Sequence, residues 1–585
     1  MKRVVTFAVV CFLPIGLFAQ TRSVLVATRH ASHLSIRSLA TSFDPSAPGR
    51  NYTQFQIVNG FAANLTDAEI ASLRKSPEVL YVEDDVERHA FSAPAARSQA
   101  LTPAPAAVGQ ITPYGITDVA APQAWVAGRG NGVNVAILDT GIDYNHPDLA
   151  PAYAGGYNAI TKTNDPKDDN GHGTHCAGII AAADNNIGVV GVAPLARIWS
   201  VKVLDSQGNG KTSNVIDALN WVSQQKAQLG GNWVISLSLG SCSASNLEQQ
   251  AFESAISQGI LVVAAAGNHD PTAPDVCSST TNNSYSVEYP AAYPGVIAVA
   301  AVDSTNTAAD FSNTGSAVTL SAPGVDVLST FPTGTGQLSV LIPTSGQAIL
   351  APPVVGSPAK DVTGSYVFCN LGKPEDFPAS VAGKIALIKR GDITFHDKAQ
   401  NAKRAGAIAV VIFNKDSSAI TWTLIGKVDQ NGQPNPTVCN DPNNPGFSKC
   451  VDNPADLAFD WPLTVGISLA DGTALSQATA QNLTVSYQSK SDYQILSGTS
   501  MACPHVTGAA AVAWSVAPSK SADDVKQALI STARDLGPAG VDNTYGNGLI
   551  NVFDAAKQLN PAAFGSGGSP APTPPTGRNP GRRGH

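Results

Sequence analysis

Short runs of apolar and β-branched residues recur from Gly132 onward, separated by stretches with a helical pattern. The runs read VNVAILD, IWSVKVL, WVISLSL, ILVVAAAG and VIAVAAV, and one of the helices between them is expected at 214–228. Strands that are apolar along their whole length are buried on both faces, and strands that alternate with helices pair in parallel. The sequence therefore predicts an α/β fold in which a mostly parallel sheet is covered by helices on both faces.

Composition agrees with a folded chain of several domains. The 585 residues carry a net charge of −8, and 14% are charged and 43% hydrophobic. At about 100–200 residues per domain, this length allows three or four units. An acidic chain lacks the broad basic face that nucleic acid requires, so nucleic acid is not an expected partner.

The α/β pattern is interrupted by a second unit, in which KIALIKRG and AIAVVIFN flank a helix around Phe395. Before it, SVLVAT, YTQFQIV and VLYVEDD form a small α+β unit with a helix that Thr66 and Glu69 would cap. A linker rich in Ala, Pro and Ser follows this unit. The expected ranges are 1–20 for a signal peptide, 21–90 for the α+β unit, 91–109 for a cleavable linker, 110–333 and 487–558 for the α/β domain, 334–486 for the inserted αβ unit and 559–585 for a flexible tail.

The first residues indicate export. Lys2 and Arg3 precede an apolar stretch that ends near Ala19 and Gln20, which is the pattern of a secretory signal. The stretch is shorter than the ~20 residues that span a bilayer, so a secreted protein is expected and no membrane association. Besides Cys11 in the signal, seven cysteines remain, and an odd number leaves at least one thiol outside any intrachain bridge. The expected bridges are Cys242–Cys277 and one among Cys369, Cys439 and Cys450.

Three motifs supply an acid, a base and a nucleophile. Asp139 ends the run VNVAILD, His172 lies in GHGTHCAG, and Ser500 lies in SGTSMACPHV. A serine hydroxyl becomes nucleophilic when an imidazole takes its proton, and a buried carboxylate orients that imidazole. Asn268, after the run ILVVAAAG, would provide an oxyanion hole together with the backbone N–H of Ser500.

Each of these residues also has an ordinary structural interpretation, as a turn residue, a core histidine or a helix cap. A metal site at His172 and His175 lacks a plausible third ligand nearby and a general base of the HExxH type. The four residues occur together in the order that acyl-transfer chemistry needs, and this favours a hydrolase.

The motifs DTGID, GHGTHCAG, AAAGN and GTSMACPHV resemble those of the subtilisin-like serine proteases, over about 110–333 and 487–558. The resemblance implies a triad of Asp139, His172 and Ser500 with Asn268 as oxyanion donor. It implies a secreted serine endopeptidase, made as a self-inhibited zymogen, that hydrolyses peptide bonds through an acyl-enzyme on Ser500. The alternative is a catalytically silent homologue that acts as a protein-binding module.

The resemblance extends to the flanking units. NGFAANLT and VLYVEDD resemble the inhibitory propeptide of this family, whose removal is expected within 91–109. KIALIKRGD, RAGAIAVVIFN and PLTVGIS resemble the protease-associated domain, which is proposed to act in substrate access or protein contacts. The expected partners are protein and peptide substrates and the chain's own propeptide, and a monomer is expected.

A structural Ca²⁺ site also follows from the resemblance, because oxygen ligands suit this hard cation. The alternative is an ordinary turn rich in Asn and Gly. The expected ligands are Gln110, Asp148, Ala183, Asn185, Ile187 and Val189. A second cation site is doubtful, because Thr319 stands where an acidic ligand is expected.

The family pattern also implies the walls of the primary specificity pocket. These walls are Ser236, Leu237, Ser238, Leu239 and Gly240 on one side, and Ala264, Ala265, Ala266 and Gly267 on the other, with Glu288 near the base. A carboxylate there would favour Lys or Arg in the substrate, unless its side chain points to solvent. Cys176 and Cys503 depart from the commonest motif residues and are expected to be buried thiols or to pair with each other.

Overall fold

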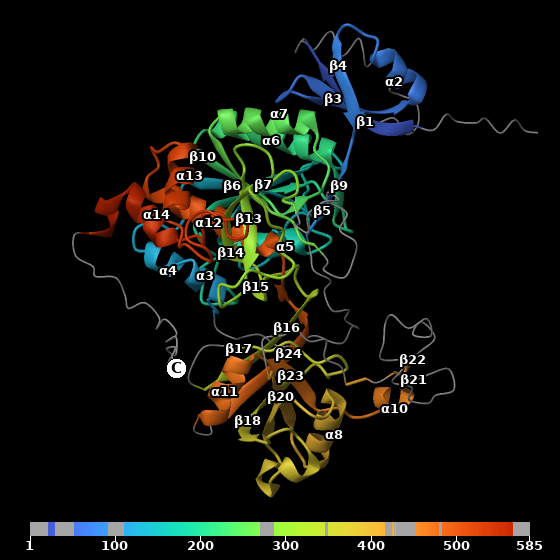
Figure 1. Cartoon of the computed structure of the whole chain (residues 1–585), viewed down its shortest axis with the longest axis vertical. Coiled ribbons are helices and arrows are strands. Elements are labelled where there is room, and N and C mark those ends of the chain that lie inside the picture. Colours follow the sequence, from blue (N-terminus) through green and yellow to red (C-terminus); the bar gives the residue numbers. More distant parts are fainter. Residues whose placement is uncertain are drawn as a thin grey trace, which may run out of the picture.

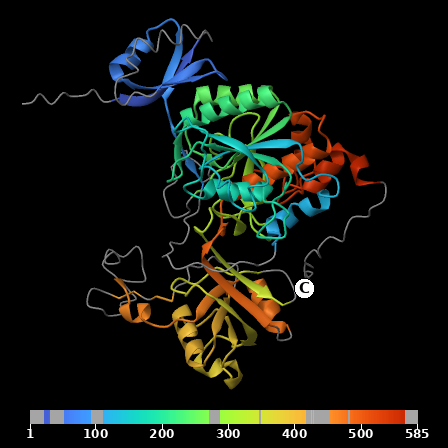
Figure 2. The ribbon, with the colours of Figure 1, turned by 180° about the vertical axis from the view of Figure 1, so that it is seen from behind.

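A computed structural model describes residues 21–29, 52–91, 110–269, 286–344, 349–415, 424–425, 427–428, 451–478 and 482–565. The expected signal peptide and most of the linker and tail lie outside these residues. A small N-terminal unit lies at one end of a large α/β body, and an inserted unit lies at the opposite end (Figures 1 and 2).

The large body is built on a seven-stranded sheet in the order β14-β13-β12-β10-β6-β8-β7. Every neighbouring pair in this sheet is parallel. The strands are β6 (Val133–Asp139), β7 (Tyr153–Asn158), β8 (Arg197–Lys202), β10 (Asn232–Leu237), β12 (Ile260–Ala265), β13 (Ile297–Val302) and β14 (Val318–Pro323). The predicted parallel α/β sheet is thus confirmed, and the five apolar runs lie on five of its strands.

Alternate residues of each strand enter two separate cores, so both faces are buried. In β6, Val135 and Ile137 belong to one core and Ala136 and Leu138 to the other. The first core packs against α5 (His172–Ala181), α12 (Thr499–Val516), α13 (Ala522–Ser531) and α14 (Val552–Leu559), with α3 (Tyr114–Asp118) and α4 (Ala121–Ala124) at its margin. The second core packs against α6 (Thr212–Leu229) and α7 (Asn246–Ser257).

The N-terminal unit is a four-stranded antiparallel sheet in the order β2-β3-β1-β4, with one helix. Its elements are β1 (Thr21–Thr28), β2 (Tyr52–Phe55), β3 (Gly60–Thr66), α2 (Asp67–Leu73) and β4 (Val79–Asp84). Thr66 and Glu69 form a capping box at the start of α2, as the sequence predicts.

Two carboxylates join this unit to the large body at helix N-termini. Glu83 accepts hydrogen bonds from Ser245 Oγ at 2.6 Å and from the backbone N–H of Leu247 at 3.0 Å, where α7 begins. Asp85 accepts from the backbone N–H and the hydroxyl of Ser213, at 2.8 and 2.7 Å, where α6 begins. The first N–H groups of a helix have no intrahelical partner and favour negative charge, so both contacts stabilise the docked unit.

After β4 the chain enters the large body as β5 (Glu87–Ala90). This strand pairs antiparallel with β11 (Leu239–Gly240) on one side and with β9 (Asn209–Lys211) on the other. A three-stranded sheet results, in which the middle strand comes from the N-terminal unit.

The inserted unit contains a second seven-stranded sheet in the order β17-β16-β24-β18-β19-β20-β23. Its strands are β16 (Gly336–Pro343), β17 (Ile349–Leu350), β18 (Asp361–Phe368), β19 (Ile385–Lys389), β20 (Ala409–Phe413), β23 (Leu463–Ile467) and β24 (Asn482–Ser491). The unit also contains β21 (Lys427–Val428), β22 (Val451–Asp452), α8 (Phe395–Arg404), α10 (Pro454–Leu457) and α11 (Leu469–Gln477).

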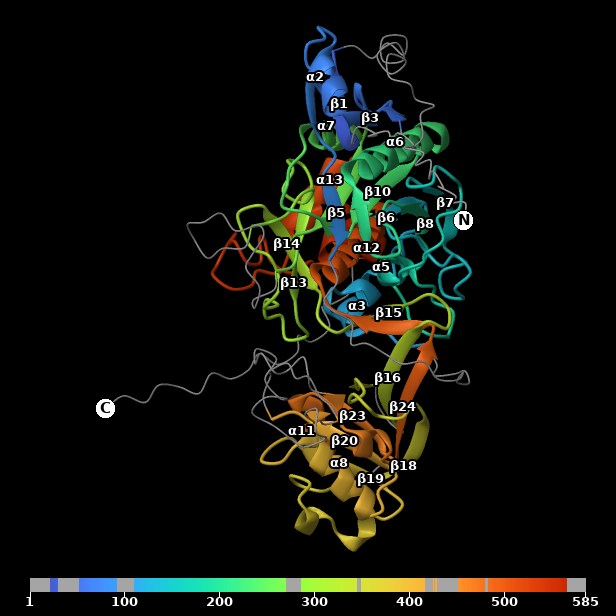
Figure 3. The same ribbon diagram turned by 90° about the vertical axis from the view of Figure 1, so that its right-hand side faces the viewer.

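A two-stranded ribbon connects the insert to the large body. β15 (Val327–Thr330) pairs antiparallel with β25 (Tyr493–Leu496), and β16 and β24 continue the same two segments into the insert (Figure 3). The expected boundary between 486 and 487 falls inside β24, which runs from Asn482 to Ser491.

The cysteines narrow one expectation. Cys242 is disulfide-bonded, while its expected partner Cys277 lies outside the described residues, as do Cys439 and Cys450. Cys369 is a free thiol, so it takes no part in the bridge expected among the three later cysteines. It is fully buried in an apolar cluster, and this burial raises its pKa to about 12. Among the described residues, no helix is long and apolar enough to cross a membrane.

Loss of the Glu83 cap should loosen α7 specifically. We expect Glu83→Ala, introduced into an uncleaved Ser500→Ala precursor, to remove about 1 kcal/mol of stabilisation and to speed amide exchange at Leu247 about fivefold. Hydrogen–deuterium exchange measures this change. Asp84→Ala is the matched control, because Asp84 pairs with Arg22 inside the N-terminal unit. Equal exchange in both variants would contradict the capping role.

Candidate active site

Asp139 and His172 meet at the carboxyl edge of the central sheet. Asp139 is the last residue of β6, and His172 is the first residue of α5. Nδ1 of His172 lies 2.7 Å from Oδ1 of Asp139, and both side chains are at least 97% buried. The backbone N–H of Thr140 donates to the same carboxylate oxygen at 2.7 Å.

The environment of His172 makes its imidazole a stronger base. Burial disfavours the charged imidazolium, but the charge and hydrogen bond of Asp139, with a smaller effect of Asp168, outweigh this, and the pKa of His172 is raised. Its Nε2 atom is buried and has no hydrogen-bond partner in the described part of the chain. This arrangement leaves one ring nitrogen anchored and the other available to take a proton.

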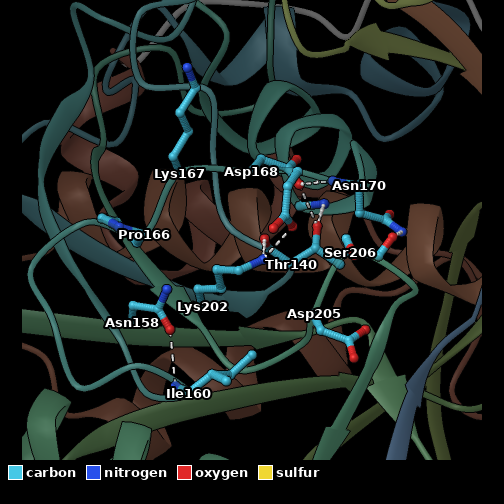
Figure 4. Close-up of polar contacts among 12 residues, drawn as sticks. Thr140, Asn158, Ile160, Pro166, Lys167, Asp168, Asn170, Lys202, Asp205 and Ser206 are labelled. Carbon is cyan, nitrogen blue, oxygen red and sulfur yellow. Dashed lines mark hydrogen bonds and ion pairs between the residues drawn. The ribbon is translucent and has the colours of Figure 1, made fainter.

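Asp168 organises the loop that delivers His172, and the sequence analysis missed it. Its Oδ1 accepts from Thr140 Oγ1 and the N–H of Gly171, both at 2.9 Å, and from the N–H of Asn170 at 3.0 Å. Its Oδ2 accepts from the N–H and hydroxyl of Thr174, at 3.0 and 2.6 Å, in the first turn of α5. Figure 4 shows Asp168 beside Thr140, with Lys202 donating to the Thr140 carbonyl from below. The acidic stretch just before GHGTHCAG was the signal that could have identified it.

His175 does not join this site. Its Nε2 lies 3.1 Å from the carbonyl oxygens of Val327 and Gln494, and burial lowers its pKa to about 3. Within the described ranges, the one cluster with metal-ligand spacing is Asp139, His172 and Cys176. Burial raises the pKa of Cys176 well above its usual value, so the thiol stays neutral.

Ser500 lies in the first turn of α12, beside α5. Its hydroxyl donates to the carbonyl of Ser238 at 3.1 Å. Its own carbonyl accepts from Ser238 Oγ at 2.9 Å and from Cys176 Sγ at 3.5 Å. Because Cys176 lies one turn after His172, these contacts place Ser500 in the same buried site as the Asp139–His172 pair.

Asn268 faces this site with its amide nitrogen. Oδ1 of Asn268 accepts from the backbone N–H and the hydroxyl of Thr499, at 2.9 and 2.7 Å. The Thr499 hydroxyl is in turn the acceptor for the N–H of Gly267 at 3.2 Å. With the oxygen held in this way, Nδ2 is directed at the carbonyl oxygen of Phe91, 3.5 Å away.

The Phe91 carbonyl oxygen lies near the two expected oxyanion donors. A Cβ added to Gly498 would lie 2.8 Å from this oxygen, 3.1 Å from Asn268 Nδ2 and 3.6 Å from the backbone nitrogen of Ser500. One small volume is therefore bordered by a carbonyl oxygen, a side-chain amide and a helix N-terminal N–H. Only glycine at 498 leaves room for the carbonyl.

The chain just before Phe91 is held as an extended strand. Leu239 pairs with Ala90 and Gly240 pairs with His89 across β11 and β5. The Phe91 ring packs against Gly240, where an added Cβ would lie 2.5 Å from the ring tip.

The expected pocket residues divide into two groups. The first group borders the site. Ser238 contacts Ser500, while Leu239 and Gly240 pair with β5 and Gly240 also contacts the Phe91 ring. Gly267 and Glu288 contact each other. Ser236 Oγ accepts from Thr507 beneath α12, and Leu237, Ala264, Ala265 and Ala266 are buried in the two cores of the sheet. The Glu288 carboxylate accepts from Asn313 Nδ2 at 3.2 Å beside Gly267.

The residues expected to bind calcium also gather in one place. Nε2 of Gln110 donates to the Ala183 carbonyl at 2.8 Å and lies 3.4 Å from the Val189 carbonyl. Asp148 accepts from Asn185 Nδ2 at 2.9 Å and from the N–H of Val189 at 3.0 Å. The Ile187 N–H donates to Asn185 Oδ1 at 3.1 Å. The cluster consists of carboxylate, amide and carbonyl groups, which offer only oxygen ligands to a hard cation.

Comparison with known proteins agrees with this geometry. The model of the subtilase family matches residues 130–348 and 379–548, and that of peptidase inhibitor I9 matches 19–91. Together the two subtilase segments cover more than half of the chain. The chain belongs to the subtilase family.

Individual relatives support the assignment. Subtilisin E of Bacillus subtilis (strain 168) is 38% identical over 313 residues, which are 53% of this chain and 72% of that protein. Thermitase of Thermoactinomyces vulgaris is 41% identical over 244 residues, which are 42% and 79% of the two chains. The crystal structure of the psychrophilic subtilisin-like protease Apa1 from the Antarctic Pseudoalteromonas sp. AS-11 aligns with a TM-score of 0.57 and 32% identity, covering 78% of this chain and 100% of that one.

This subtilase is therefore a subtilisin-like serine endopeptidase that carries its own I9-type inhibitory propeptide. The match to the inhibitor ends at residue 91, the residue whose carbonyl faces Asn268.

The raised pKa of His172 predicts the acid limb of the pH profile. Only the neutral imidazole can take a proton, so activity should fall as pH drops through an apparent pKa above the ordinary 6.5 of histidine. Burial lowers the pKa of a histidine, so a cleft that opens and readmits water raises the pKa of His172 further. The pH dependence of kcat/KM for the mature enzyme measures this, and a midpoint below 6.5 would contradict the Asp139 contribution.

Proposed function

We propose that Ser500 is the nucleophile of this endopeptidase, and that its first substrate is the peptide bond after Phe91. The Phe91 carbonyl oxygen supports this most strongly, because it lies beside Asn268 Nδ2 and borders the same small volume as the Ser500 N–H. The proposed cut falls at the start of the linker expected to contain the processing site.

The roles of the other groups follow from their contacts. The Ser500 hydroxyl turns from the Ser238 carbonyl toward His172 Nε2, transfers its proton there and attacks the Phe91 carbonyl carbon. Asp139 holds the imidazole through Nδ1 and stabilises its charged form. Asn268 and the Ser500 N–H stabilise the oxyanion. His172 then protonates the leaving amine of Ser92, and water releases the acyl group from Ser500.

Inhibition follows from the same contacts. After the cut, β5 remains paired on both edges, and Glu83 and Asp85 still cap two helices of the body. The cleaved propeptide thus occupies the cleft as a product that dissociates slowly, until it is degraded.

The occupied cleft also bears on the primary pocket. Phe91 contacts Gly240 with its ring, which supports a preference for large apolar residues before the cut bond. The Glu288 carboxylate accepts a hydrogen bond from Asn313 Nδ2 beside Gly267. We therefore propose an apolar primary specificity instead of the Lys or Arg preference considered from sequence.

The remaining parts of the chain have supporting roles in this proposal. The first 20 residues direct secretion, the inserted unit is a protease-associated domain that contacts protein substrates, and the mature enzyme is a monomer. The disulfide at Cys242 is consistent with an oxidising compartment.

A Ca²⁺ ion bound by Gln110, Asp148 and Asn185 with the carbonyls of Ala183, Ile187 and Val189 would fix the mature N-terminus to the loop after α5. Its role is structural, because these residues lie apart from Asp139, His172 and Ser500 in every contact described above. Binding only to the folded state stabilises it.

Processing tests the proposed nucleophile. Wild-type protein should be cut after Phe91, so N-terminal sequencing of the mature form should begin at Ser92 or at a later trimmed residue. The mature form should also react with a phosphonylating serine-hydrolase probe. Ser500→Ala should leave the propeptide attached and abolish labelling, since the hydroxyl that attacks the peptide bond and the probe is then missing. Absence of labelling in mature wild type would contradict the assignment.

Calcium removal tests the proposed metal site. Chelation should lower the Tm of the mature enzyme by several degrees, because a ligand at 100 times its Kd adds about 2.7 kcal/mol of stability. Asp148→Asn should reduce this calcium-dependent shift. Asp184→Asn is the matched control in the same loop, because the Asp184 carboxylate pairs with Arg129. Equal Tm values with and without calcium for wild type would reject the site.

A further inference from the structure

A fully buried ion pair lies in the cleft, three residues before Phe91. Arg88 of β5 and Glu248 of α7 both have side chains that are 0% exposed. Arg88 Nη2 lies 2.5 Å from Glu248 Oε2, and Arg88 Nε lies 3.2 Å from Glu248 Oε1. The guanidinium and the carboxylate therefore form a two-point contact, which is specific in geometry as well as charge.

Residues of the body hold the Glu248 carboxylate in place. Tyr293 donates its hydroxyl proton toward Glu248 Oε2 at 2.8 Å and accepts from the Ser245 N–H at 2.8 Å. Ser245 Oγ in turn accepts from the backbone N–H of Glu248 at 3.2 Å. Ser241 adds a second acceptor for the arginine, at 2.5 Å from Nη1. The body thus forms a polar pocket for one guanidinium from Glu248, Ser241 and Tyr293.

The backbone ladder sets which residue of a bound peptide enters this pocket. Arg88 is opposite Gly210 in β9, while the next two residues pair with β11. A substrate that occupies the cleft in this register, with its cut bond at the Phe91 position, places its fourth residue before that bond against Glu248. The pocket is therefore part of the substrate cleft and not only a contact of the propeptide.

The energetics favour a basic residue at that position. Burial opposes the charge of Arg88, but the attraction of Glu248 outweighs this and the pKa of Arg88 is raised, so the guanidinium stays charged. An apolar side chain there would leave a buried carboxylate with no positive partner, and such truncations are costly. An acidic side chain would add repulsion.

We propose that Glu248, with Ser241 and Tyr293, selects substrates that carry arginine four residues before the cut bond, in an Arg-x-x-Phe pattern. This inference rests on the proposed function of the cleft around Ser500. Glu248 acts as a specificity-determining residue and takes no part in bond breaking.

Peptide hydrolysis by mature wild-type enzyme tests the inference. The substrate is an internally quenched peptide with the sequence of residues 86–93, and three others replace its arginine by Lys, Leu or Glu. We expect kcat/KM to fall in the order Arg, Lys, Leu, Glu, with the arginine peptide about 30-fold or more above the leucine peptide. Equal rates for the arginine and leucine peptides would overturn the inference.

Two enzyme variants separate the pocket from general damage. Glu248→Gln should reduce the preference for arginine over leucine to a few-fold, because an amide of the same shape lacks the charge. Glu253→Gln, on the exposed face of the same helix, should keep the wild-type ratio. A wild-type ratio in Glu248→Gln would also overturn the inference. If Glu248→Gln does not mature, the peptide series on wild type decides alone.

A short substrate distinguishes the two levels of the proposal. Ala-Phe-anilide has no residue that reaches Glu248, so wild type and the Glu253→Gln control should cleave it at similar rates. If the mature enzyme cleaves this anilide but hydrolyses the arginine and leucine peptides at equal rates, the Glu248 inference alone is rejected. No cleavage of any substrate by the mature wild type rejects the proposed function of the cleft.

Discussion

The burial of α12 is the constraint on which the rest of the structure depends. All but one of its 18 residues are buried, and the helix contacts strands β6, β10, β12, β13 and β14 as well as α5 and α14. Ser500 at its start is thereby held against the carboxyl edge of the sheet, where Asp139 ends β6. Because 324 positions separate Cys176 from Ser500, the two halves of the site meet only when this helix is packed.

The sequence predicted those parts of the protein that local patterns encode. The apolar runs identified the sheet strands, and Asp139 ends one of them as the sequence indicates, where its carboxylate contacts His172. It could not reveal Asp168, whose five hydrogen bonds depend on how its loop folds back toward Thr140. Cys369 shows a similar limit, since its burial is set by packing within the insert and not by cysteine spacing.

The contact between Arg88 and Glu248 illustrates the same limit over a longer range. The two residues are 160 positions apart and belong to different units, and neither lies in a recognisable motif. Their pairing follows from two separate constraints: Glu83 and Asp85 fix where the N-terminal unit docks, and the β5 ladder fixes the register. A sequence shows the charges, whereas only the folded chain shows that one of them is aimed into a cleft.

The ribbon of β15 and β25 has a consequence for the folding of the whole chain. Val327 is opposite Leu496 and Thr330 is opposite Tyr493, so the insert leaves and re-enters the large body at adjacent points. The entropy of closing a long loop grows slowly with its length, and an insert that folds by itself brings its own ends together. To the α/β body, the folded insert is then equivalent to a short hairpin turn, and the surrounding chain can pair as if the inserted residues were few.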